Sequence, residues 1–387
     1  MSKITLIAIS TFGLEGIVKR ELQTLGFNNL KASNGKVEFE AEIEDIPKAN
    51  LWLRSADRVL LKMGQFQAQT FDELFEGAKA LPWETWITED GQFTVTGTSV
   101  KSTLGSVRAC QSIVKKAVVE RLKDEYATDW FDETGPAFTI KVALLKDVAL
   151  LTIDTSGSGL NRRGYRSQAG KAALKETMAA ALVQLSYWNR DRLLIDPMCG
   201  SGTILIEAAM IARNIAPGLR RKFASEAWPA IRQRAWDLAR GDAKQAVIKD
   251  AELQLFGYDI DEAMIKISKT NARAAGVEED ILFAQKDVKD LWIDKQYGVV
   301  ISNPPYGMKL GELQALNQIY IALHKMFRKK KGWSIYILTA DKKFPDYFKR
   351  ARPDRTRKLY NGNIEVNYYQ YYGERPPKNV TKKEVQA

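Results

Sequence analysis

Histidine and cysteine are nearly absent from this 387-residue sequence, which contains one histidine and two cysteines. His324, Cys110 and Cys199 are too few for a zinc site of ordinary ligand count or for a disulfide framework. No apolar run approaches the roughly 20 residues that a membrane-spanning helix requires. Residues 1–9 alternate like a strand and are too short for a secretory signal. We therefore expect a cytoplasmic protein with no metal and no membrane contact.

Acidic residues are scarce in the second part of the chain. Residues 1–160 contain 18 Lys and Arg against 22 Asp and Glu, whereas residues 161–387 contain 40 against 25. Lysine and arginine gain free energy by releasing counterions from phosphates, so this asymmetry favours a polyanion bound against residues 161–387. Many basic proteins bind no nucleic acid, so charge alone leaves the partner open.

The length of the chain predicts more than one domain. Residues 1–155 show strand and helix patterns in an α+β order, and the small residues at 155–159 predict a hinge. Seven strands follow, with helices between the first five, which is typical of a doubly wound, Rossmann-like α/β sheet. We expect them at residues 193–196, 253–259, 281–286, 298–302, 334–339, 358–361 and 366–372. Residues 214–250 interrupt this series as a basic helical insertion.

The first of these strands ends in a glycine-rich turn, Asp196-Pro197-Met198-Cys199-Gly200-Ser201-Gly202-Thr203. Gly200 and Gly202 allow close approach of a ligand, and the following helix presents free N–H groups. A tight turn without a ligand has the same pattern. The spacing fits neither a dinucleotide fingerprint nor a P-loop. Asp196 at the strand tip would repel phosphate and attract a cation, which favours S-adenosylmethionine.

Carboxylates also follow the second and third strands. Asp259 ends the second strand, where it can accept both hydroxyls of a ribose. Asp261 is predicted to cap the helix at residues 262–275. Asp287 could accept a hydrogen bond from an adenine amino group or be a solvated turn residue.

The fourth strand ends in Asn303-Pro304-Pro305-Tyr306, the most informative segment of the sequence. Two prolines fix the backbone and remove two donors, so the turn presents carbonyl oxygens and the Asn303 amide. Such a turn can accept hydrogen bonds from an amino group, and Tyr306 can stack on a planar base. We expect these four residues to be the reaction centre.

At these motifs the chain resembles class I methyltransferases. Residues 161–166 and 173–182 look like the segment that precedes this fold in THUMP-domain RNA methyltransferases, and residues 12–15, 99–104 and 110–117 resemble the amino-terminal modules of that family. The chain is most similar to the RlmL/YpsC group, although Met308-Lys309 stands where many relatives have an acid and an arginine. The resemblance implies a ferredoxin-like domain at residues 1–60, a THUMP domain at 61–155, and at 160–387 a seven-stranded mixed methyltransferase sheet whose last strand is antiparallel.

The resemblance also implies an activity and a cofactor site. The activity is methylation of guanine N2 in large-subunit ribosomal RNA, with S-adenosylhomocysteine as the product. The expected cofactor residues are Lys175, Glu176, Thr177, Asp196, Pro197, Cys199, Gly200, Gly202, Thr203, Asp259, Ile260, Asp287 and Val288.

Two basic groups are candidates for RNA contact. The first is Lys101, Arg108, Lys115 and Lys116, for which a solvated helix face is an equal alternative; the second is Arg220, Arg221 and Lys222. Trp228 and Trp236 are expected in a core. Three other activities remain open: methylation of guanine N2 in transfer RNA, methylation of adenine N6, and methylation of glutamine. A non-enzymatic alternative also remains open, namely an RNA-binding assembly factor.

Overall fold

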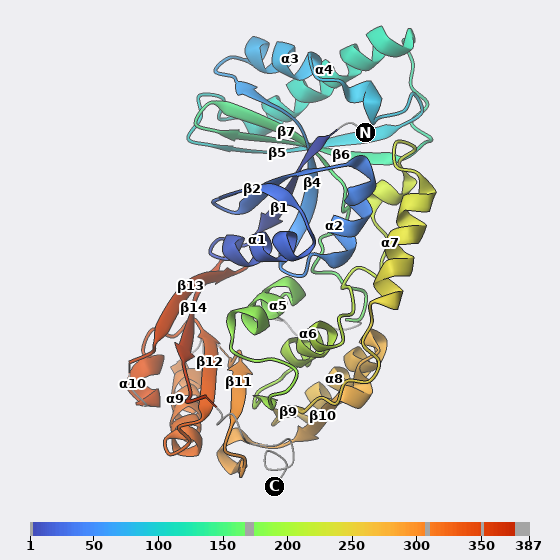
Figure 1. Cartoon of the computed structure of the whole chain (residues 1–387). Coiled ribbons are helices and arrows are strands. Elements are labelled where there is room, and N and C mark those ends of the chain that lie inside the picture. The colour runs from blue at the N-terminus through green and yellow to red at the C-terminus, as the bar shows by residue number, and fades with distance from the viewer. Residues whose placement is uncertain (1–2, 167–173, 306–309, 350–351, 376–387) are drawn as a thin grey trace. The chain divides into compact units, whose positions relative to one another are not determined.

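The computed structural model describes residues 3–166, 174–305, 310–349 and 352–375. The chain forms two compact units, and its course is traced in Figure 1. Unit 1 comprises Met1–Ser10, Val18–Leu160 and Arg221–Asp242. Unit 2 comprises Thr11–Ile17, Asn161–Arg220 and Ala243–Ala387. No described helix is both long and apolar enough to cross a bilayer.

Unit 1 contains a seven-stranded sheet of order β2-β3-β1-β4-β7-β6-β5. Among these described strands, only β5 and β6 pair in parallel. Its strands and helices are β1 (Ile4–Ser10), α1 (Glu15–Thr24), β2 (Asn28–Ser33), β3 (Lys36–Ala41), α2 (Ile46–Trp52), β4 (Ala56–Gln67), α3 (Phe71–Lys79), β5 (Gln92–Val100), α4 (Val107–Tyr126), β6 (Ala137–Leu145) and β7 (Val148–Asp154). The domain boundary expected after residue 60 lies inside β4, which pairs with β1 on one side and β7 on the other.

The segment expected as an insertion of the methyltransferase sheet contributes to the core of unit 1. Residues 221–242 belong to this unit and contain most of helix α7 (Gln233–Gln245). Trp228 and Trp236 are 1% and 0% exposed, and they join the same apolar cluster as Phe138. Trp228 stacks on Phe138 with ring centroids 4.9 Å apart. Both tryptophans are therefore core residues.

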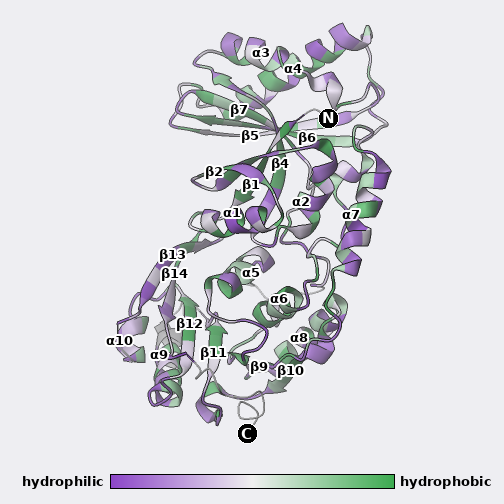
Figure 2. Ribbon diagram, in the orientation of Figure 1, coloured by the Kyte–Doolittle hydropathy of each residue, from purple (hydrophilic) through white to green (hydrophobic). Residues whose placement is uncertain are grey.

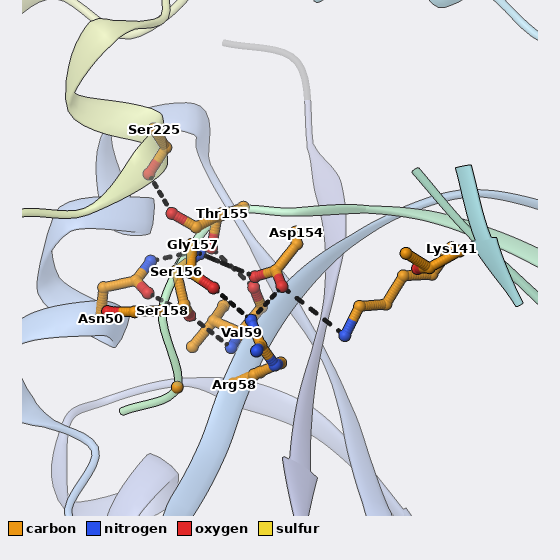
Figure 3. A network of polar contacts seen from close by, with 12 residues as sticks. Asn50, Arg58, Val59, Lys141, Asp154, Thr155, Ser156, Gly157, Ser158 and Ser225 are labelled. Atoms are coloured by element: carbon orange, nitrogen blue, oxygen red, sulfur yellow. Dashed lines mark hydrogen bonds and ion pairs between the residues drawn. The ribbon is translucent and has the colours of Figure 1, made fainter. Parts of the chain in front are cut away.

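Within the expected hinge at residues 155–159, Thr155 and Ser156 form a buried polar network just before the unit boundary that follows Leu160 (Figure 3). Thr155 and Ser156 are fully buried. The Thr155 hydroxyl donates to the Val59 carbonyl at 2.7 Å, and the Ser156 hydroxyl donates to the Asn50 side chain at 2.7 Å. Ser225 donates to the Thr155 carbonyl at 2.8 Å. Small residues here allow close backbone packing, and the chain leaves unit 1 after this network.

Unit 2 contains the second seven-stranded sheet, of order β10-β9-β8-β11-β12-β14-β13. The first five strands in this order are parallel, and β14 is antiparallel to both β12 and β13. Its elements are α5 (Glu176–Leu185), β8 (Leu194–Asp196), α6 (Thr203–Ala212), β9 (Leu255–Asp259), α8 (Glu262–Ala275), β10 (Ile281–Gln285), β11 (Gly298–Ser302), α9 (Leu310–Phe327), β12 (Trp333–Thr339), α10 (Phe344–Phe348), β13 (Arg355–Asn361) and β14 (Ile364–Tyr371).

Two apolar layers cover the two faces of this sheet. Because neighbouring strand residues point to opposite faces, Val299 packs in the layer that contains residues of α5, α6 and α8. Val300 packs in the layer that contains residues of α9 and α10. All five residues of β11 are buried, and Figure 2 shows the hydrophobic colour along this strand. The doubly wound sheet with a mixed edge that the sequence predicts is confirmed.

Candidate active site

A pocket of about 470 Å³ lies in unit 2, where the parallel strands β8, β9, β10 and β11 end. The carboxyl ends of neighbouring parallel strands share one sheet edge, which is the usual place for a ligand in this architecture. The pocket is lined by twelve of the residues expected from the sequence: Asp196, Pro197, Cys199, Gly200, Thr203, Asp259, Ile260, Asp287, Val288, Asn303, Pro304 and Pro305. The structure therefore brings the acidic strand tip and the proline turn into one cavity.

Other residues expected at the site do not line this pocket or are not described. Gly202, Lys175, Glu176 and Thr177 are not among the lining residues. Tyr306 lies outside the described part of the chain. The lining also includes residues that the sequence analysis did not single out, namely Leu174, Met198, Ser201, Ile204, Met264, Lys289 and Ile319. Most of these are apolar side chains, and no sequence pattern separates an apolar pocket wall from a core.

Asp196 is the most strongly perturbed acid in the pocket. It is 2% exposed, and its Oδ1 accepts the Ser302 hydroxyl at 2.7 Å and the Met198 N–H at 3.2 Å. Burial raises the pKa of Asp196 to about 7, against the lowering effect of these two hydrogen bonds, and the carboxylate of Asp259 adds to the rise. A buried acid with such a pKa gains by contact with a cationic ligand, because the cation favours the charged carboxylate.

The glycine-rich turn adopts backbone conformations that side chains rarely allow. Gly200 and Gly202 have φ angles of 51° and 79°. A Cβ on Gly202 would lie 2.9 Å from the Phe283 ring, so only glycine fits there. Gly202 caps helix α6, whose first turn faces the pocket through Thr203 and Ile204. The thiol of Cys199 has a pKa raised by burial and then by the carboxylates of Asp196 and Asp259, so it remains protonated.

Asp259 holds the glycine turn from the adjacent strand. Its Oδ2 accepts the Gly200 N–H at 2.9 Å and its Oδ1 accepts the Asp261 N–H at 3.0 Å. Asp261 caps α8 by accepting the Ala263 N–H at 2.8 Å, which confirms the capping role predicted for it. Asp287 caps a short turn by accepting the Lys289 N–H at 2.9 Å, while it also lines the pocket.

The proline turn presents an acceptor that makes no hydrogen bond within the described residues. The Asn303 Oδ1 is buried and lacks a partner there, although a buried amide oxygen is normally paired. Pro304 is buried and Pro305 is exposed. Asn303, Pro304 and Pro305 all line the pocket that contains Asp196. An unpaired acceptor in a ligand cavity is suited to an incoming donor such as an amino group.

Arg166 connects the segment before the sheet to the glycine turn. Its guanidinium donates to the Thr203 hydroxyl at 2.7 Å and to the Leu174 carbonyl at 2.8 Å, and both of these residues line the pocket. It also pairs with the buried Glu176 at 3.4 Å. Burial raises the pKa of Glu176. Glu176 therefore contacts Arg166, which in turn contacts two residues of the pocket lining.

The basic residues expected to contact RNA have different surroundings. Lys101, Arg108, Lys115 and Lys116 belong to unit 1, the last three on α4, and all four are exposed. Arg220 and Lys222 are also exposed, and the Arg220 guanidinium donates to the Ala274 carbonyl.

Arg221 is 9% exposed and serves the packing of unit 1. Its guanidinium donates to the carbonyl oxygens of Ser158 and Gly159, each at 2.5 Å, and stacks on Phe223 with its Cζ 4.8 Å from the ring centroid. These contacts explain its buried position without an RNA partner.

Three family models match the chain along its length. Residues 5–60 match the RlmL ferredoxin-like domain, residues 68–154 match the THUMP domain, and residues 163–370 match the methyltransferase domain described as RMKL-like. The last match alone covers more than half of the chain. The chain belongs to the RMKL-like methyltransferase family. The chain is accordingly an S-adenosylmethionine-dependent methyltransferase.

Individual relatives agree with this assignment. The chain is 48% identical over 385 residues to a Bacillus subtilis protein provisionally named RNA methyltransferase YpsC, covering 99% of this chain and 100% of that one. It is 34% identical to the ribosomal RNA large subunit methyltransferase K/L of Psychromonas ingrahamii, covering 95% of this chain. The chain spans only 50% of the length of that second relative.

Two solved structures share the whole fold. A protein from Listeria monocytogenes, described as a predicted N6-adenine-specific DNA methylase, is 47% identical with a TM-score of 0.92 and covers 97% of each chain. SMU.472, solved in complex with SAH, is 42% identical with a TM-score of 0.92, covering 97% of this chain and 100% of that one. A relative of the same fold thus binds the product that the RMKL-like family forms from S-adenosylmethionine.

Proposed function

We propose that this RMKL-like protein transfers a methyl group to an exocyclic base nitrogen of RNA, and that guanine N2 of large-subunit ribosomal RNA is the target. One observation carries this proposal: the Asn303 Oδ1, which has no hydrogen-bond partner among the residues that the structure describes, lies in the same pocket as Asp196 and Asp259. The pocket thereby combines a cation-binding acid with an acceptor for an amino group. The THUMP match in unit 1 and the names of the relatives support RNA as the substrate.

The pocket residues fit S-adenosylmethionine by charge and size. A volume of about 470 Å³ is within the usual range for a cofactor of this size. Asp196 and the glycine turn would hold the methionine part, Asp259 the ribose and Asp287 the adenine. The cofactor supplies an electrophilic methyl group on a sulfonium. The residues around it bind, orient and exclude water, which is where most of the barrier reduction arises in direct transfer.

The proline turn is proposed to hold the acceptor base. The target base leaves its stack, as in other enzymes that modify bases. The Asn303 side-chain oxygen and the Pro304 carbonyl accept the two amino hydrogens, so the nitrogen lone pair points to the methyl group. Tyr306 is proposed to stack on the base. No covalent intermediate is required, and the protonated Cys199 thiol is poorly suited to form one.

Unit 1 is proposed to capture the RNA. We retain the domain limits expected above as a proposal, with residues 1–60 and 61–155 as the two amino-terminal modules. Lys101, Arg108, Lys115 and Lys116 would contact phosphates. Arg220 and Lys222 are the remaining candidates outside α4. Because phosphate contacts release counterions, RNA affinity should fall steeply as salt concentration rises.

Methylation of adenine N6 is a second candidate, favoured by the name of the Listeria relative. The proline turn accepts hydrogens from either amino group, so the decision requires product analysis. Labelled S-adenosylmethionine should be incubated with separated DNA, RNA and protein fractions. Nucleosides from ribosomal and transfer RNA should then be compared by mass spectrometry in cells with and without the protein. Loss of N2-methylguanosine from ribosomal RNA supports the proposal, whereas loss of N6-methyladenosine, or label in DNA or protein only, contradicts it.

A further inference from the structure

Ser302 forms a direct hydrogen bond between the two halves of the candidate active site. It is the last residue of β11 and is fully buried. Its hydroxyl donates to the Asp196 Oδ1 at 2.7 Å. Asp196 belongs to the cofactor turn, whereas the residue that follows Ser302 is Asn303, which begins the proline turn. A single hydroxyl therefore joins the strand tips that hold the two reactants.

The sheet places these residues in register. Strands β8 and β11 are parallel neighbours, with Val299 opposite Leu194 and Val300 opposite Ile195. Ser302 and Asp196 lie at the ends of these strands. We propose that Ser302 is a positioning residue, which favours the charged form of the Asp196 side chain and orients it for the cofactor while it fixes the start of the proline turn. This inference rests on the cofactor placement proposed above.

The groups that face Asp196 show why this hydroxyl matters. From β9, the carboxylate of Asp259 opposes a second negative charge nearby. From the turn after β8 come the Met198 N–H, which stabilises the carboxylate, and the thiol of Cys199, which is protonated. From β11 comes the Ser302 hydroxyl, which lowers the pKa of Asp196 against the rise caused by burial. Removing the hydroxyl would raise the pKa of Asp196 further, so the carboxylate would be neutral at a higher pH than in the natural protein.

The test measures SAH affinity by calorimetry on the full-length protein between pH 6 and pH 9. A Ser302→Ala variant whose Asp196 has a pKa one unit higher should bind SAH about tenfold more weakly than wild type at pH 6, and equally well at pH 9. Ser302→Cys keeps a weaker donor in nearly the same volume, so its SAH affinity at pH 6 should lie between those of wild type and Ser302→Ala. Ser334→Ala is the matched control, because Ser334 is 1% exposed on the neighbouring strand β12 and its hydroxyl accepts the Gly373 N–H at 3.1 Å.

The pH profiles distinguish the role of Ser302 from the cofactor placement at Asp196. Wild-type affinity should itself fall about tenfold from its plateau at pH 6, since the pKa of Asp196 is about 7. A flat wild-type profile would overturn the cofactor placement. A normal wild-type profile with an unshifted Ser302→Ala profile would overturn the role of Ser302 alone. An equal loss of affinity at pH 6 and pH 9, or the same loss in Ser334→Ala, would show that the hydroxyl only supports the packing of the sheet.

Discussion

Replacing Asp196 by asparagine should stabilise the free protein while it abolishes tight cofactor binding. The substitution keeps the shape of the side chain and the oxygen that accepts the Ser302 hydroxyl, but it removes the charge. In the folded protein Asp196 has a pKa of about 7, against 3.8 for an unperturbed side chain. Between pH 3.8 and about pH 7, the folded state therefore still holds a proton that the unfolded chain has already released. The stability of the wild type consequently decreases as the pH rises from about 4 to about 7.

The magnitude follows from this displacement. Each pKa unit corresponds to about 1.4 kcal/mol, so ionising Asp196 in the free protein costs roughly 4 kcal/mol above pH 7. At pH 5 the cost is roughly 1.6 kcal/mol, because most of the folded molecules still hold the proton. The asparagine variant would have no such cost at either pH. For a unit of this size, about 4 kcal/mol corresponds to an increase of Tm on the order of 10 °C.

Thermal unfolding of wild type and Asp196→Asn at pH 5 and pH 8, each with and without SAH, would measure both effects. We expect the Tm advantage of the variant to be larger at pH 8 than at pH 5, and we expect SAH to raise the Tm of the wild type only. An advantage that is the same at both pH values would refute the electrostatic explanation. A variant that is less stable than wild type at pH 8 would refute it as well.

Three further substitutions test other parts of the molecule. Asn303→Ala should lower kcat on RNA about a hundredfold with little change in SAH affinity, as measured by single-turnover kinetics and calorimetry, and an unchanged kcat would remove Asn303 from the reaction centre. Asp259→Ala should weaken SAH binding by roughly 2 kcal/mol, because a charged acceptor for the ribose is lost; calorimetry with an unaltered Kd would contradict that placement. Trp236→Ala should destabilise unit 1 by about 3–5 kcal/mol, because its side chain is fully buried; a denaturation midpoint equal to that of wild type would show that the site tolerates a cavity.

The sheet of unit 2 could be predicted because its strands are short apolar runs that end in distinctive residues. Strand β11 occupies the range expected from the sequence, since five buried residues lead directly into the proline turn. The cap formed by Asp261 was predictable because capping depends on neighbouring residues only. The strand tips of β8 and β11 share a pocket because parallel strands align their carboxyl ends.

Features that depend on distant partners could not be predicted in the same way. An amphipathic pattern indicates that Trp236 faces a core, but it does not identify which core. The polar residues at 155–159 have the composition of an exposed hinge, and only the structure shows Asn50 and Ser225 as their partners. The role of Ser302 could not be predicted either, because serine is common at strand ends and only the structure shows its hydrogen bond to Asp196 on β8.

The return of residues 221–242 to unit 1 has a consequence for anyone who divides this protein. The backbone passes from one unit to the other after Ser10, Ile17, Leu160 and Arg220, and once more after Asp242. A fragment that stops at Leu160 would lack Trp228 and Trp236, and would keep Leu14 without the apolar layer in which it packs. Cloning either half as a contiguous gene segment would thus leave both products with gaps in their interiors. The two units should therefore be expressed and engineered as one chain.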